Sequence, residues 1–330
     1  MPAMPDLYVC HTAYQLLVDL LRAARKGGGH HLVLTTAVPD AEALRGRLLA
    51  TGAFAGVTLV DEGKFPGMVQ GPFAALRARR DFVRACGWQL HRAHYGEVYI
   101  HNDWSPLGRY LQDCNAGYIL CEDTFASTLG PDQHLVYDQR KAPQGRYLYW
   151  GDSPACRAVE TEDAARCTLF PPEKLVEDRK ADLLASLTDA EKAMVRAVFL
   201  TQPLPEHAEG ATLLLTRSFV ADGLLDQPAQ DRMFLAVARQ YAAGPLFVKA
   251  HPRDTADYAA LFPQAVVLQR TMPSEVLNFC LPFRFRRAVT VQSFALRGFT
   301  AADEKVTLTL EQALALPGAA PAAPQKGGQA

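Results

Sequence analysis

One short segment joins an apolar run to side chains that can carry charge and protons: GPLFVKAHPRD, residues 244–254. The apolar run predicts a buried strand of a parallel sheet, and a His-Pro turn follows it directly. In open α/β sheets ligands collect at the carboxyl ends of the strands, so Lys249 and His251 stand where binding and catalysis usually occur. Pro252 restricts the backbone of His251, which lowers the entropy cost of holding the imidazole in one direction. A loop histidine without a ligand is the alternative interpretation.

Polar side chains also follow two predicted strands in the first half of the chain. Asn102 and Asp103 come after the strand expected at 97–100, and Glu122 and Asp123 come after the next one. Asn and Asp before a helix can simply cap it. Two adjacent carboxylates are either a solvated turn or an acid–base site, and their place at the end of a strand favours the second.

The elements that must position these residues form two runs of alternating strands and helices. The first run predicts strands at 7–10, 31–34, 57–60, 97–100 and 118–121, with helices at about 13–26, 40–51 and 71–94 and from 106. Between 140 and 210 the pattern weakens, apart from a helix to about 200 opened by the capping box Thr188-x-x-Glu191. The second run predicts strands at 212–216, 246–249, 265–268 and 288–291, with helices at 228–243, 254–261, 274–279 and from 293.

Two such runs predict an α/β protein of two Rossmann-like, doubly wound domains that face a central cleft. The expected domains are 1–205 and 206–316. The segment 317–330 is rich in Ala, Pro, Gly and Gln and is expected to be disordered. Neither GxGxxG nor GxxxxGK[ST] occurs, which argues against an NAD-linked or P-loop enzyme. No isolated DxD occurs either, so we expect neither a metal nor a cofactor.

Composition limits the class of partner. The net charge is −1 and the pI about 6.8 in 330 residues, which gives no reason to expect nucleic acid as a partner. Seven scattered cysteines without a CxxC pair predict reduced thiols in the cytoplasm. The N-terminus lacks the basic and apolar regions of a signal peptide, and no apolar run approaches the roughly 18 residues of a membrane span. Peripheral contact with a membrane stays open, as does a homodimer.

Motifs spread over about 300 residues resemble the bacterial sialyltransferases of glycosyltransferase family 52, the lipooligosaccharide group, and more distantly the capsule polysialyltransferases. Their order along the chain is that of the family. The matching pieces are His11-Thr12-Ala13-Tyr14-Gln15-Leu16, Asn102-Asp103 with Leu107-Gly108, Glu122-Asp123, Leu215-Thr216 with Ser218-Phe219 and Asp222-Gly223, Lys249 with His251-Pro252-Arg253-Asp254, Pro273-Ser274-Glu275, and Thr290-Val291-Gln292-Ser293.

The resemblance implies a GT-B arrangement, CMP-sialic acid as donor, a galactose-ended cell-surface glycan as acceptor, inversion at the anomeric carbon and no metal. It implies that His251 and Ser293 contact the donor phosphate, that Glu275 holds the ribose, and that Asp123 activates the acceptor. The full set expected on the donor side is Thr216, Ser218, Lys249, Pro252, Ser274, Glu275 and Ser293. On the acceptor side it is Thr12, Gln15, Asn102, Asp103 and Glu122. The same resemblance implies that the acceptor glycan belongs to lipooligosaccharide or capsule, and that the protein meets the inner membrane peripherally.

Two departures from the family pattern leave alternatives open. Thr124 replaces the usual glycine after the acidic pair, and Phe294 replaces the second hydroxyl at the phosphate. A transferase using another nucleotide sugar, such as a glucosyltransferase, and a non-catalytic nucleotide-sugar or glycan binding protein therefore both remain. Asp123 and Asp222 are both candidates for the catalytic base, and the acidic motif favours Asp123.

Overall fold

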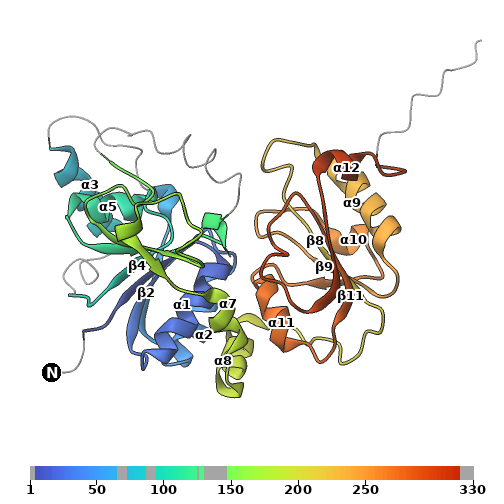
Figure 1. Cartoon of the computed structure of the whole chain (residues 1–330), viewed down its shortest axis with the longest axis horizontal. Coiled ribbons are helices and arrows are strands. Elements are labelled where there is room, and N and C mark those ends of the chain that lie inside the picture. The colour runs from blue at the N-terminus through green and yellow to red at the C-terminus, as the bar shows by residue number, and fades with distance from the viewer. Residues whose placement is uncertain (1–3, 65–72, 87–93, 125, 130–146, 320–330) are drawn as a thin grey trace, which may run out of the picture. The chain divides into compact units, whose positions relative to one another are not determined.

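A computed structural model describes residues 4–64, 73–86, 94–124, 126–129 and 147–319 of the chain. It divides into two units, Met1–Val198 and Phe199–Ala330, a few residues before the boundary predicted at 205. Each unit is a parallel sheet with helices along it (Figure 1). The predicted α/β class with two Rossmann-like units is confirmed. Among the described residues no helix is long and apolar enough to cross a membrane.

Unit 1 holds a seven-stranded sheet in the order β3-β2-β1-β4-β5-β6-β7, and all neighbouring strands are parallel. The strands are β1 (Leu7–Cys10), β2 (His30–Thr35), β3 (Phe54–Val60), β4 (Val98–Ile100), β5 (Tyr118–Leu120), β6 (Cys156–Thr161) and β7 (Leu175–Glu177). The helices are α1 (Ala13–Arg25), α2 (Ala41–Ala50), α3 (Ala74–Cys86), α5 (Pro106–Asp113), α7 (Lys180–Ala185) and α8 (Asp189–Phe199). The strand order reverses between β1 and β4, the place where such sheets bind ligands.

Unit 2 repeats this plan with five parallel strands in the order β10-β9-β8-β11-β12. The strands are β8 (Thr212–Leu215), β9 (Leu246–Lys249), β10 (Val266–Leu268), β11 (Phe285–Val291) and β12 (Ala302–Leu308). The helices are α9 (Gln227–Tyr241), α10 (Tyr258–Leu261), α11 (Leu277–Cys280) and α12 (Leu310–Leu314), and a 3-10 turn at Ser274–Val276 precedes α11. Here the order reverses between β8 and β11.

Several predicted elements differ from the structure. The helix expected from Ser293 is absent: Gln292 has a φ of 47°, and the Ser293 hydroxyl accepts the Ala295 N–H at 3.2 Å in a turn. The helix expected at 254–261 begins only at Tyr258, where Asp257 caps it. The sequence did not predict β6, β7, β12 or α12. Parts of the helix expected at 71–94 and most of the expected tail lie outside the described residues.

A buried network of charged side chains crosses unit 1 beneath the carboxyl ends of its strands. At its centre Arg22, on α1, donates to Asp19, Glu160 and Asp178. Lys180 on α7 is 1% exposed and binds Asp178 at 2.8 Å and Glu160 at 3.4 Å. The network therefore ties α1 to β6 and α7.

His101 completes this network next to Asp19. Its Nδ1 lies 2.7 Å from the Glu122 carbonyl oxygen and its Nε2 lies 3.1 Å from the Asp19 carboxylate. Both partners are acceptors, so both ring nitrogens are placed to donate. Burial alone would raise the pKa of Asp19, but the interactions with His101 and Arg22 outweigh it and lower that pKa. Arg22 and Lys180 are thus paired with Asp19, Glu160 and Asp178, and His101 adds a contact to Asp19.

Removing one cation from this network should destabilise unit 1. Lys180→Met keeps most of the apolar stem but leaves a buried negative charge uncompensated, and we expect it to lower the free energy of unfolding by about 3–5 kcal/mol. All three tryptophans, at 88, 104 and 150, belong to unit 1, so the urea midpoint followed by tryptophan fluorescence reports on this unit. The control is Lys192→Met, whose pair with Asp189 is at the surface and should change stability by less than about 1 kcal/mol. Equal midpoints for the two variants would contradict the prediction.

Candidate functional site

His251 lies directly after β9, at the carboxyl edge of the second sheet. Its backbone N–H donates to the Thr216 hydroxyl at 3.0 Å, and its Nδ1 accepts the Arg253 N–H at 3.2 Å. Because Nδ1 accepts, the proton of the neutral ring is on Nε2. Burial, with help from Arg253 and Lys249, lowers the pKa of His251 to about 4. At neutral pH His251 is therefore an N–H donor without a charge.

Asp254 holds the turn that carries His251. Its buried carboxylate accepts hydrogen bonds from Thr216, from Gln230 and, at 2.5 Å, from the hydroxyl of Tyr258. The Thr216 hydroxyl thus links this carboxylate to the His251 backbone. Sequence analysis identified Asp254 as part of the turn but missed Gln230 and Tyr258, since nothing in their local sequence marks them.

Arg253 lies beside His251 in the same turn, and Asp222 holds both Arg253 and Arg217. Asp222 accepts from Arg217 at 3.0 Å and from Arg253 at 2.9 Å. Burial alone would raise the pKa of Asp222, but these hydrogen bonds outweigh it and lower that pKa. Arg217 also donates to the Gln292 carbonyl oxygen at 2.7 Å, which joins the loop after β8 to the turn after β11. Sequence analysis missed Arg217.

The other residues expected on the donor side make contacts within unit 2. The Lys249 ammonium is buried and donates to the carbonyl oxygens of Ala250 and Arg270, and burial lowers its pKa to about 8. Ser218 donates to the Arg253 carbonyl oxygen at 3.4 Å. Glu275 is buried, accepts from Ser274 at 3.2 Å, and has a pKa raised by burial. Pro252 lies in the His251 turn.

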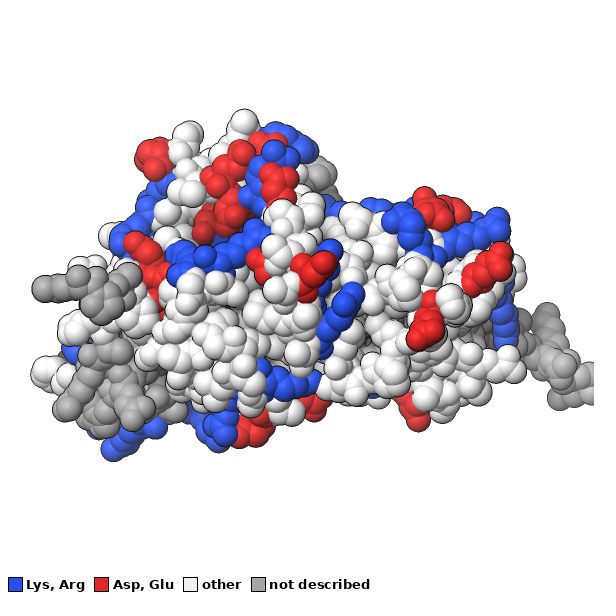
Figure 2. Space-filling model, turned by 90° about the horizontal axis from the view of Figure 1, so that it is seen from below, with Lys and Arg blue, Asp and Glu red and all other residues white. Residues whose placement is uncertain are grey.

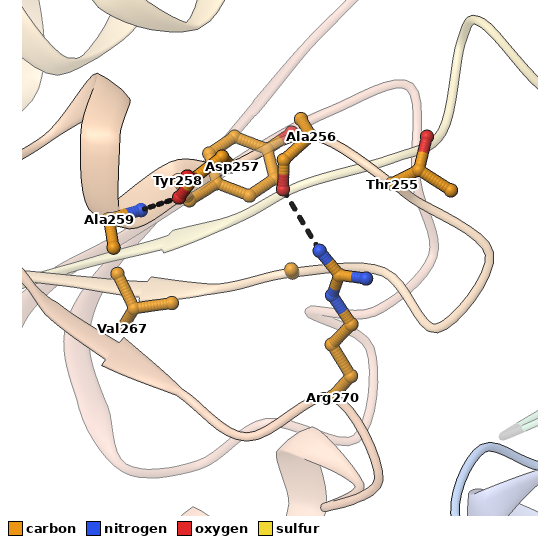
Figure 3. A pocket seen from close by; sticks show the side chains of 8 residues that line it. Thr255, Ala256, Asp257, Tyr258, Ala259, Val267 and Arg270 are labelled. Carbon is orange, nitrogen blue, oxygen red and sulfur yellow. Dashed lines mark hydrogen bonds between the residues drawn. The ribbon is translucent and has the colours of Figure 1, made fainter.

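A hollow of about 210 Å³ lies near this turn, between α10 and the ends of β9 and β10. Figure 3 shows Tyr258 and Asp257 on one side of it and Arg270 on another, with Arg270 bound to the Ala256 carbonyl oxygen at 2.9 Å. The Asp257 carboxylate points to the start of α10 and caps it. Three polar side chains that line the hollow, Asp257, Tyr258 and Arg270, thus form hydrogen bonds within the protein.

In unit 1, Gln15 joins the end of β1 to Asp123. Its side-chain N–H donates to the Asp123 carboxylate at 2.5 Å, and its oxygen accepts from the backbone of His11 and Thr12. The Thr12 hydroxyl in turn accepts the Gln15 N–H, which caps α1. Asp123 is exposed and lies after β5. The structure therefore brings together two of the predicted acceptor-side residues, Thr12 and Gln15, with the predicted base Asp123.

Of the three remaining acceptor-side residues, Glu122 and Asp103 are buried and Asn102 is partly buried. Glu122 is buried, accepts from Thr128, and has a pKa raised by burial. Asp103 is fully buried and accepts the N–H groups of Trp150 and Gly151, both at 2.9 Å, so its carboxylate anchors the chain after 147. The side-chain oxygen of Asn102 is buried without a hydrogen-bond partner among the described residues. Thr124, the departure from the family motif, is exposed.

No metal cluster is found in the described part of the chain, and the face drawn in Figure 2 does not carry one kind of charge alone. No three His, Cys, Asp or Glu side chains there converge as ligands would. On the face drawn in Figure 2, basic and acidic side chains are interspersed.

No family model matches the chain. A stretch of 94 residues is 33% identical to an uncharacterized protein of Haemophilus influenzae, covering 28% of this chain and 30% of that protein. Among solved structures, the α/β-galactoside α-2,3-sialyltransferase of Photobacterium phosphoreum is similar over 93% of this chain and 91% of its own, with a TM-score of 0.52 and 10% identity. The chain therefore shares with this structure a fold of two Rossmann-like units. The UDP-GlcNAc 2-epimerase of Neisseria meningitidis matches over 88% of this chain and 78% of its own, with a TM-score of 0.48 and 8% identity.

The lowered pKa of His251 predicts a pH effect on stability. The unfolded chain takes up a proton near pH 6.5, whereas the folded ring stays neutral to about pH 4, so stability is lost as the pH falls through this window. His251→Asn keeps an acceptor for the Arg253 N–H but does not titrate. The fall in melting temperature between pH 7 and pH 5, measured by calorimetry, should be smaller in this variant than in the wild type. His207→Asn, at an exposed histidine of unit 2, should retain the wild-type fall; an equal fall in all three proteins would refute the assignment.

Proposed function

We propose that the protein is an inverting, metal-independent glycosyltransferase that moves sialic acid from CMP-sialic acid to a terminal galactose of a cell-surface glycan. The observation that carries the proposal is the Nε2–H of neutral His251 next to Arg253, which shares Asp222 with Arg217, at the carboxyl edge of a Rossmann-like sheet. The GT-B fold and the ordered family motifs support the same activity. The proposal includes a cytoplasmic location for the protein, with peripheral contact at the inner membrane.

The chemistry requires stabilisation of a leaving phosphate and removal of one proton. The acceptor hydroxyl oxygen forms a bond to the anomeric carbon while the bond between that carbon and the CMP phosphate oxygen breaks. The electron pair of the broken bond stays on the phosphate oxygen. The His251 N–H and the two arginines would stabilise that oxygen. Thr216, Ser218 and Lys249 hold the loops around it, since their polar groups bond within unit 2.

Asp123 is the base in this proposal. Asp222 is held by two arginines and its pKa is lowered, both of which make it a poor proton acceptor. Asp123 is exposed at the carboxyl edge of the first sheet, and Gln15 orients it. A carboxylate in this setting can take the proton of the acceptor hydroxyl.

A thermal-shift screen of CMP, UDP, GDP and ADP tests the donor. A nucleotide that binds the folded state adds about 2.7 kcal/mol to the free energy of unfolding at a hundredfold excess over Kd. The melting temperature rises as a result. We expect CMP to give the largest shift. A larger shift with UDP would point to a different nucleotide sugar, and no shift with any of the four would refute the proposed function.

The base assignment is tested by two matched variants. Asp123→Asn should lower sialyl transfer by roughly 10²–10⁴-fold while leaving CMP affinity unchanged, because a base acts only on the acceptor proton. Asp222→Asn should weaken CMP binding, because it releases the two arginines, and should lower turnover less. Initial rates at saturating donor and CMP titration measure the two effects. Wild-type turnover in Asp123→Asn, with loss of turnover in Asp222→Asn, would assign the base to Asp222.

A further inference from the structure

Phe294 is an exposed aromatic side chain in the turn that follows β11. It is 48% exposed, although Arg297 lies over its ring at 3.9 Å from the centroid. The backbone N–H of Arg297 also donates to the Phe294 carbonyl oxygen at 2.9 Å. The guanidinium thus supports the ring from one side by a cation–π contact, while much of the side chain faces solvent.

The turn that carries Phe294 is joined to the predicted phosphate site. Arg217, which shares Asp222 with Arg253, donates to the carbonyl oxygen of Gln292, two residues before the phenylalanine. His251 follows β9 and Phe294 follows β11, and β8 is the one strand between these two. Two interstrand spacings are roughly 10 Å, which is the reach of a nucleoside monophosphate from its phosphate to its base.

We propose that Phe294 is the stacking surface for the nucleobase of the donor. The inference rests on the proposed function and adds a binding role for one residue. An aromatic ring stacks on any base, and the loss of such a contact costs about 1–3 kcal/mol. The affinity comes from the ring face, so an aromatic replacement preserves it and an aliphatic one does not.

The test compares ligands with and without a base. In calorimetric titrations, CMP should bind the wild type roughly 5- to 150-fold more tightly than ribose 5-phosphate, the range that corresponds to this stacking energy. Phe294→Ala should lose this advantage for CMP and for UMP alike, and its affinity for ribose 5-phosphate should stay at the wild-type value. Phe294→Tyr should retain CMP binding.

Val176→Ala is the matched control, since Val176 is an equally exposed apolar residue of unit 1. Its CMP affinity should equal that of the wild type. Unchanged CMP affinity in Phe294→Ala would overturn the inference and leave the proposed function standing. If the wild type bound neither CMP nor ribose 5-phosphate, both would fall. An equal loss of CMP and ribose 5-phosphate affinity in Phe294→Ala would also overturn the stacking role.

Discussion

The charge of Arg22 must be cancelled inside unit 1, and much of the local structure follows from this constraint. An unpaired ion in such a site costs several kcal/mol, so its neighbours must supply opposite charge with good geometry. Asp19, Glu160 and Asp178 do so from α1, from β6 and from the loop after β7, and His101 and Lys180 contact the same carboxylates. One consequence reaches the edge of the sheet: His101 holds the Glu122 carbonyl oxygen, directly before Asp123.

Unit 2 positions its loops mainly with polar groups that are neutral. The Asp254 carboxylate is surrounded by a hydroxyl, an amide, a phenol and a backbone N–H, from Thr216, Gln230, Tyr258 and Ala256. These donors satisfy the carboxylate without a buried cation. Two arginines of this unit, Arg217 and Arg253, follow the ends of β8 and β9, where Asp222 orients them.

The sequence predicted the elements whose apolar pattern is strong, and it missed those whose pattern is masked by charge. The apolar runs of β1, β8 and β9 are fully local signals. In β12, an edge strand, the charged residues Asp303, Glu304 and Lys305 prevent pairing with another chain. In β6 Glu160 belongs to the ion network. Neither strand therefore has an apolar sequence pattern. The same holds for the site. Strand ends indicated Asp123 and His251, and the resemblance to family 52 indicated Gln15, but the partners Arg217 and His101 depend on contacts between distant segments.

Burial decides which of the basic groups in unit 2 can supply charge to a phosphate. Lys249 and His251 are drawn toward their neutral forms, with the pKa of the first lowered to about 8 and that of the second to about 4. The Lys249 ammonium moreover points to two carbonyl oxygens. A guanidinium resists such a shift because its pKa is far higher. In the proposed function, the positive charge offered to a phosphate at this edge therefore comes from Arg217 and Arg253, because the Lys249 ammonium is held by carbonyl oxygens, while His251 contributes a directed N–H.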